Sequence, residues 1–419
     1  MNRNKKLKIH NKKILILQTG TYCSKNKGDA AMQQVFAAEV KRKEPKAEVI
    51  IGSPFPEIDT SFYSPIKVIK SRRRNLPLST LNWLIFEFLK ILGLPPKRWF
   101  MGEEVDFISR ADLIVDLSGD MLTEDYGPLI GFSHFLPLLQ AQALRRPVII
   151  CAQSVGPFRR LKPLARRIFS NARVITVRES FSYELLRDLN PSKIKPLLTA
   201  DLAFLLPKAS DSRIEELFLA EGILQKKRPR LGISVNALLA NAANPHLKKN
   251  KNDNLDLFAK ALDMAIERLG IEIMLVPHVF GPRQRGDDRL PSEILKRKMK
   301  HSVYTIKGEY RPEEMKGIIA SCDAFIGCRM HANISALDSN VPVLAVGYSH
   351  KTRGILNELR LSDWAIPVED LTTEKLFYFI SQLFAKAATY RKHLSEQLPH
   401  LRECAQSNIS IILKELKPG

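Results

Sequence analysis

The stretch that decides the fold is residues 322–336, CDAFIGCRMHANISA. Its first half is a short apolar run that predicts a strand, its second half predicts a helix, and residues 341–347 predict the next strand. Strand, helix and strand in this order form a parallel crossover unit. Arg329 and His331 would then lie where the first strand ends and the helix begins, which is the edge where open α/β sheets collect their ligands.

The chemistry of this edge points to an anionic substrate. The first amide groups of a helix lack intrahelical partners and the peptide dipoles add, so a helix amino terminus favours anions. Arg329 supplies a permanent cation that can bind a carboxylate or phosphate through two parallel hydrogen bonds. His331 supplies a proton donor near neutral pH. These two side chains predict chemistry on a substrate that carries negative charge.

The same alternation of strand, polar loop and helix runs along most of the chain. It predicts an α/β fold of two Rossmann-like domains that face each other across a cleft, with helices at the carboxyl end. The first strand and helix are not joined by the dinucleotide fingerprint G-x-G-x-x-G. We expect four segments: a first domain at 1–206 with an insertion at 54–100, a linker at 207–229, a second domain at 230–388, and a final helix at 389–419.

The bulk composition favours anionic partners. The chain of 419 residues has a formal net charge of +21, from 65 Lys and Arg against 44 Asp and Glu. Such an excess suits nucleic acid, an acidic polymer, a negative membrane surface or a phosphorylated substrate. The basic runs lack interleaved aromatic residues, so we expect no nucleic-acid partner. Five scattered cysteines, no metal-ligand spacing and no apolar run of about 18 residues predict a cytoplasmic protein without a metal site or spanning helix.

One segment departs from the alternation. Residues 78–92 are rich in large apolar side chains and follow three arginines at positions 72–74. Two interpretations remain open: a helix that covers the core of the first domain, or an interfacial helix that lies on the inner face of an anionic membrane.

Several short motifs, taken in order and spacing, resemble the polysaccharide pyruvyl transferase family and the GT-B architecture of many glycosyltransferases. The resemblance spans roughly residues 13–360. The motifs are Asn26-x-Gly28-Asp29, Gln153–Pro157, Val177–Ser180, Asp201, Pro277-His278, Asp287-Asp288 and Gly327–His331. One position departs from the family pattern: Ser118-Gly119-Asp120 stands where the family usually has a glycine-rich turn.

The resemblance implies transfer of pyruvate from phosphoenolpyruvate to a sugar of a cell-surface glycan or lipid-linked saccharide, as a ketal and without a cofactor. Arg329 and Arg178 would bind the carboxylate and phosphate of the donor, and His331 would be the general acid or a hydrogen-bond donor to the phosphate. His278 and Asp288 would orient or deprotonate the acceptor. The remaining substrate-binding candidates are Lys307 for phosphate, Asn26 and Asp29 for a ligand hydroxyl or as simple helix caps, Asp120 on the acceptor side, and Ser154.

Other functions fit parts of the sequence. A GT-B glycosyltransferase with a nucleotide-sugar donor would also need cations and a helix terminus, and a catalytically silent scaffold for glycan assembly would need neither. For an enzyme, we expect Arg329→Ala to abolish turnover and to leave the melting temperature nearly unchanged.

Overall fold

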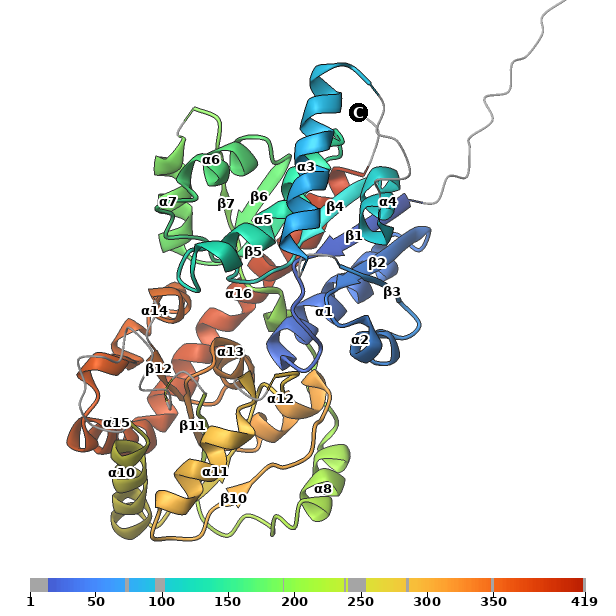
Figure 1. Cartoon of the computed structure of the whole chain (residues 1–419). Coiled ribbons are helices and arrows are strands. Elements are labelled where there is room, and N and C mark those ends of the chain that lie inside the picture. Colours follow the sequence, from blue (N-terminus) through green and yellow to red (C-terminus); the bar gives the residue numbers. More distant parts are fainter. Residues whose placement is uncertain are drawn as a thin grey trace, which may run out of the picture.

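The computed structural model describes residues 14–71, 75–94, 102–190, 192–236, 239, 254–283, 286–347 and 350–416. The basic amino terminus at 1–13, the three arginines at 72–74 and most of the polar loop at 237–253 lie outside these residues. Within them, the chain forms two parallel sheets with helices packed around each, one above the other in Figure 1. The predicted fold class, two Rossmann-like domains of the GT-B type, is confirmed.

The first sheet forms from short apolar strands that are buried on both faces, as parallel strands usually are. Within the described residues it has seven parallel strands in the order β3-β2-β1-β4-β5-β6-β7. The strands are β1 (Ile14–Thr19), β2 (Ala47–Ser53), β3 (Lys67–Lys70), β4 (Leu113–Asp116), β5 (Val148–Gln153), β6 (Val174–Val177) and β7 (Leu197–Leu198).

The helices of the first half cover both faces of this sheet. One face packs against α4 to α7 through the cluster that includes Phe135, Leu139 and Ile168. The other face packs against α1 through Met32 and Phe36, and that cluster continues into the second domain. The helices are α1 (Lys27–Lys43), α2 (Pro56–Tyr63), α3 (Leu76–Ile91), α4 (Glu103–Arg110), α5 (Pro128–Ala143), α6 (Lys162–Ser170), α7 (Ser180–Leu189), the 3-10 helix η3 (Leu202–Leu205) and α8 (Asp211–Ala220).

The second sheet repeats this construction. Its described strands lie in the order β10-β9-β8-β11-β12-β13, all parallel. They are β8 (Arg230–Ser234), β9 (Glu272–Leu275), β10 (Tyr304–Thr305), β11 (Ala324–Gly327), β12 (Val343–Gly347) and β13 (Ala365–Pro367). The α-helices are α10 (Asn254–Leu269), α11 (Arg289–Lys298), α12 (Pro312–Ala320), α13 (Met330–Asp338), α14 (His350–Glu358), α15 (Thr373–Ala385) and α16 (Ala387–Lys414), with 3-10 helices η6 (Ser362–Trp364) and η7 (Val368–Asp370).

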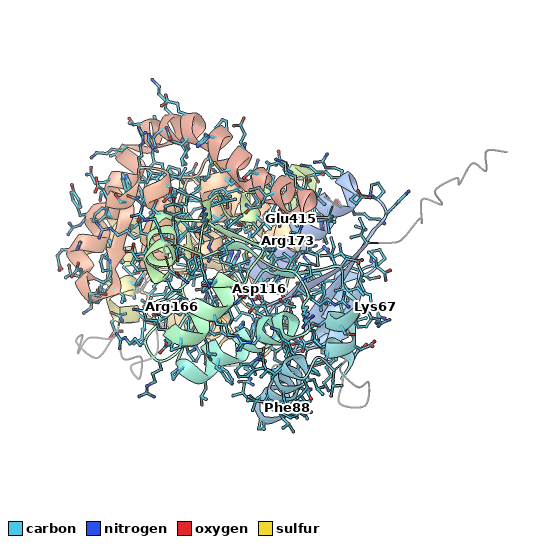
Figure 2. The ribbon with its side chains drawn as sticks, turned by 90° about the horizontal axis from the view of Figure 1, so that it is seen from above. Lys67, Phe88, Asp116, Arg166, Arg173 and Glu415 are labelled. Atoms are coloured by element: carbon cyan, nitrogen blue, oxygen red, sulfur yellow. The ribbon has the colours of Figure 1, made fainter. Side chains whose placement is uncertain are left out.

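The last helix joins the two domains. Near its start, the hydroxyl of Tyr390 donates to the carbonyl of Val343 in the second sheet, at 3.0 Å. Five turns later, Asn408 accepts hydrogen bonds from the hydroxyls of Thr176 and Thr199 and donates to the carbonyl of Ala200. Figure 2 shows the far end of α16 at the first domain, where Glu415 pairs with Arg173. The final helix therefore belongs to the cores of both domains.

Candidate active site

The amino terminus of α1 meets the second domain directly. Asn26 caps the helix, with its side-chain oxygen accepting from the amide of Gly28 at 3.2 Å. The amide of Lys27 donates to the carbonyl of His278, and the amide of Phe280 donates to the carbonyl of Lys25. The loop before α1 and the loop after β9 thus pair as short antiparallel backbone segments across the domain interface.

The imidazole of His331 lies against this junction. His331 stands in the first turn of α13, with 13% of its side chain exposed. A Cβ atom built on Gly28 would lie 2.2 Å from Nδ1 of His331. Only a glycine leaves room for the ring at this distance, so the first domain helps to fix the position of His331.

A carboxylate of the first domain connects His331 with Arg178. Asp201 Oδ2 lies 2.5 Å from Nη1 of Arg178 and 3.5 Å from Nε2 of His331. Nε of Arg178 also donates to the hydroxyl of Ser154 at 2.9 Å, and Arg178 and Asp201 are both almost completely buried. Burial alone raises the pKa of Asp201, but Arg178 and His331 outweigh it and hold the carboxyl pKa well below its usual range.

Arg329 has a carboxylate partner of its own. Its Nε and Nη2 atoms donate to Asp288, with the shortest contact 2.6 Å between Nη2 and Oδ1. Asp288 is fully buried and also accepts from the backbone amides of His278 and Val279. Burial raises the pKa of Asp288, against the opposing charge of Arg329. Both oxygens of Asp288 are thus engaged in holding Arg329 and the two amides, and an action of Asp288 on the acceptor stays a prediction.

His278 is a neutral imidazole in this setting. Its side chain is buried, and burial, together with the nearby charges of His331, Arg329 and Lys27, lowers its pKa to about 3. Among the described residues, nothing hydrogen bonds to its Nδ1 atom or to Nη2 of Arg178. Buried polar atoms are usually satisfied, so these two atoms are candidates for contact with a polar ligand.

Lys27 is an interface residue that sequence reasoning missed. Its ammonium group is buried, 3.0 Å from Glu309 of the second domain and close to the rings of Phe62 and Phe280. Burial lowers the pKa of Lys27, and Glu309 opposes that shift. A signal was present in the sequence, because a lysine at the first position of a helix is unfavourable for the helix dipole and so calls for a specific partner.

Polar side chains at the carboxyl ends of β1, β4 and β5 support the loop that carries Asp120. Buried Asp116 accepts from the hydroxyls of Thr19 and Ser118 and from the side-chain amide of Gln153. It lies in the interior of the first domain in Figure 2. The loop then reaches Gly119, where a Cβ would lie 3.7 Å from Nη1 of Arg178.

The other predicted site residues have separate contacts. Asp29 accepts from the amide of Tyr22 at 3.1 Å, and Asp120 accepts from the hydroxyl of Tyr126 at 2.7 Å. The side chain of Lys307 is exposed, and its backbone amide donates to Glu221. The structure therefore brings six of the predicted residues to the domain interface in two groups. Ser154 and Arg178 are linked to His331 through Asp201. His278 and Arg329 are linked through Asp288.

Comparison with known proteins decides the family. The family model described as polysaccharide pyruvyl transferase matches residues 26–350, which include all of the predicted site residues. The chain belongs to this family. It is also similar to the amylovoran biosynthesis protein AmsJ of Erwinia amylovora, with 25% identity over 380 residues that cover 85% of this chain and 88% of AmsJ. As a member of the family, the chain is a transferase with a role in polysaccharide modification.

Solved structures share the fold of this family member at low sequence identity. UDP-GlcNAc 2-epimerase from Neisseria meningitidis, bound to UDP-GlcNAc, aligns with a TM-score of 0.62 at 14% identity, over 96% of this chain and 99% of the epimerase. A glycosyltransferase from Rickettsia africae aligns with a TM-score of 0.55 at 14% identity, over 97% of this chain and 100% of the glycosyltransferase. These similarities support the GT-B architecture.

Proposed function

We propose that this transferase moves pyruvate from phosphoenolpyruvate onto two hydroxyls of one sugar, within a surface glycan or a lipid-linked saccharide, and forms a ketal. The proposal rests mainly on the cluster at Asp201, where the guanidinium of Arg178 and the imidazole of His331 share one carboxylate oxygen across the domain interface. Family membership supports the same conclusion.

The reaction needs a proton at carbon and stabilised anions. His331 delivers a proton to the methylene carbon of phosphoenolpyruvate, which makes the adjacent carbon electrophilic. Two sugar oxygens form bonds to that carbon while its bond to the phosphate oxygen breaks, and inorganic phosphate leaves. Of the two protons lost by the sugar hydroxyls, one balances the proton added to the methylene carbon, which becomes a methyl group. The other leaves with the phosphate.

The charged residues divide these tasks between the domains. Arg329, held by Asp288, and Arg178, held by Asp201 and Ser154, supply the cations for the carboxylate and phosphate of the donor. His278 is neutral and accepts a hydrogen bond from a sugar hydroxyl through its unsatisfied Nδ1 atom. Because Arg178 and His278 are buried, the donor enters when the two domains separate at Gly28 and His331, a hinge motion common in two-domain enzymes. We also propose that the protein acts in the cytoplasm.

Donor-dependent stabilisation and product analysis test this function. A ligand that binds only the native state raises the melting temperature by mass action. Phosphoenolpyruvate should raise it, whereas UDP and GDP should not. Mass spectrometry of candidate glycans after incubation with phosphoenolpyruvate should detect a pyruvate ketal, with phosphate released in equal amount. Stabilisation by UDP or GDP alone, without ketal, would instead favour a nucleotide-sugar glycosyltransferase, with which the GT-B fold is compatible.

A further inference from the structure

Among the described residues, helix α3 packs against the rest of the first domain along one side. The side chains of Ser79, Asn82 and Phe86 form the buried face of the helix. The carbonyl of Ser79 accepts a hydrogen bond from the side-chain amide of Gln140 on α5 at 2.9 Å. In Figure 1 the helix stands on the outside of the first domain. The interpretation of residues 78–92 as a covering helix therefore accounts for one of its faces.

The opposite side of α3 presents a stripe of large apolar side chains. They recur at intervals of three and four residues, which places them on one helical face. The exposed fractions are 53% for Leu81, 53% for Leu84, 61% for Phe88 and 80% for Ile91. Figure 2 shows Phe88 at the edge of the molecule. A contiguous apolar surface of this kind marks an interaction site.

Helix α6 adds positive charge beside this stripe. Arg167 of α6 pairs with Glu87 of α3, and its guanidinium lies 5.8 Å from the ring of Trp83, so the two helices are neighbours. Helix α6 contains no acidic residue. The exposed cations on α6 and the turn that precedes it are Arg159, Arg160, Lys162 and Arg166.

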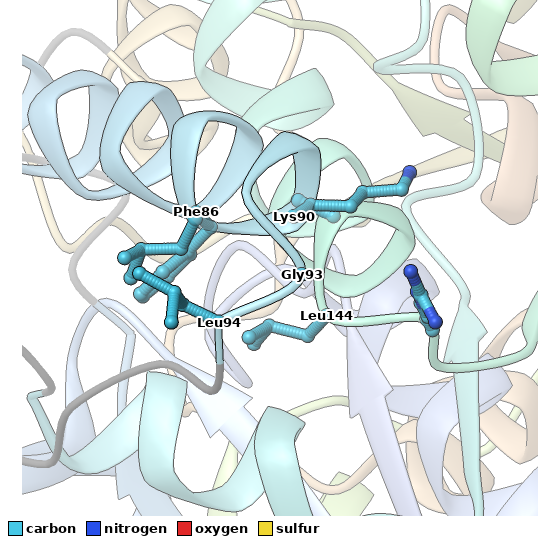
Figure 3. Close-up of a pocket in the computed structure, with 8 residues that line it drawn as sticks. Phe86, Lys90, Gly93, Leu94 and Leu144 are labelled. Carbon is cyan, nitrogen blue, oxygen red and sulfur yellow. The ribbon is translucent and has the colours of Figure 1, made fainter.

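A pocket at the carboxyl end of α3 combines the same two features. Its volume is about 270 Å³, and Figure 3 shows Lys90 at its rim and Leu94 and Leu144 beside it. The lining also includes Phe86, Leu89, Ala143 and Arg145. An apolar recess with cations around it suits the boundary between acyl chains and anionic headgroups.

We propose that this face, defined by Leu81, Leu84, Phe88 and Ile91 of α3 and the basic residues of α6, lies on an anionic lipid bilayer. The apolar stripe enters the acyl region, and the cations contact the negative headgroups. Within the described residues no helix has the length and apolarity to cross a membrane. The contact is thus peripheral, goes beyond the proposed reaction, and does not depend on the identity of the donor.

Vesicle co-sedimentation of the full chain tests the role of the apolar stripe on α3. Vesicles of phosphatidylcholine with about 30% phosphatidylglycerol should bind the protein, and the double variant Leu84→Glu/Phe88→Glu should bind at least tenfold more weakly. The matched control is Leu219→Glu/Leu224→Glu, which changes exposed leucines on and after α8 and should bind like the parent protein. All of these side chains are largely exposed, so the melting temperature should change little.

Charge variants test the role of the basic residues on α6. Lys162→Gln/Arg166→Gln should weaken binding to the anionic vesicles by about fivefold per cation and flatten its salt dependence, while binding to pure phosphatidylcholine stays the same. Equal vesicle binding by the glutamate variant and the parent protein would overturn the proposal. So would a dimer in analytical ultracentrifugation that the glutamate variant dissociates, without vesicle binding by the parent, because the face would then join two copies of this chain.

Discussion

Gly28 and His331 are in direct contact across the domain interface. The backbone of Gly28 at the start of α1 leaves so little space that a Cβ would lie 2.2 Å from Nδ1 and 2.3 Å from Cγ of the imidazole. Two motifs that are about 300 residues apart in the sequence thus form a single site. The position of the His331 ring therefore depends on Gly28, a residue without a side chain.

Gly28→Ala should therefore impair pyruvyl transfer. The added methyl group cannot fit unless the ring or the domain moves, and an overpacked contact costs about 1–3 kcal/mol. A displacement of about 1 Å at a reacting group lowers turnover by roughly 100-fold. Phosphate release from phosphoenolpyruvate measures the effect. The control is Gly286→Ala, where a Cβ meets no heavy atom within 4 Å; equal activity in both variants would contradict the role of this contact.

Arg329→Ala should destabilise the protein as well as inactivate it. Removal of the guanidinium leaves the fully buried carboxylate of Asp288 without its charge partner, which costs about 3–5 kcal/mol. The double variant Arg329→Ala/Asp288→Asn should recover much of this stability and none of the activity. Urea unfolding and phosphate release distinguish the two effects. This outcome replaces the sequence-based expectation of an unchanged melting temperature, and an unchanged unfolding free energy in the single variant would restore it.

His331→Gln should separate chemistry from donor binding. Glutamine keeps a polar side chain of similar size but cannot act as a general acid, so turnover should fall by about 100- to 10,000-fold. Arg178 and Arg329 remain in place, so phosphoenolpyruvate should still raise the melting temperature. If the variant loses that stabilisation and its turnover in parallel, His331 serves mainly to bind the donor.

His278 should make the folded state less stable in mild acid. Burial lowers its pKa to about 3 in the folded protein, below the value near 6.5 of an unfolded chain. Between these values the unfolded chain binds more protons, so the stabilisation is complete above about pH 6.5 and is lost as the pH falls toward 3. The slope for one proton is at most about 1.4 kcal/mol per pH unit. Urea unfolding between pH 4.5 and 7 should give a steeper dependence for the parent protein than for His278→Gln, and parallel curves would argue against a buried neutral imidazole.

Local sequence patterns predicted the repeated crossover units well, because strand length and helix periodicity are local properties. They missed β3 within the insertion at 54–100, since Lys67–Lys70 is a four-residue edge strand with lysine at both ends. Such a strand lacks the apolar run that identifies a central one.

The sequence motifs predict candidate site residues but not which of them contact each other. The motif positions predict Arg178, Arg329 and His331 as candidates, and the loop order predicts that they lie at sheet edges. Nothing local indicates that Asp201 pairs with Arg178. Its contact with His331, 130 residues later, depends on how the two domains meet. The same holds for buried Lys27 and its partner Glu309.

The course of α16 has a consequence for how the protein is made. Asn408 satisfies the hydroxyls of Thr176 and Thr199, which are buried in the half of the chain that leaves the ribosome first. These hydroxyls can bond to Asn408 only after α16 has been translated, and α16 follows both sheets in the sequence. The first domain therefore completes these two hydrogen bonds only after the second domain has been synthesised.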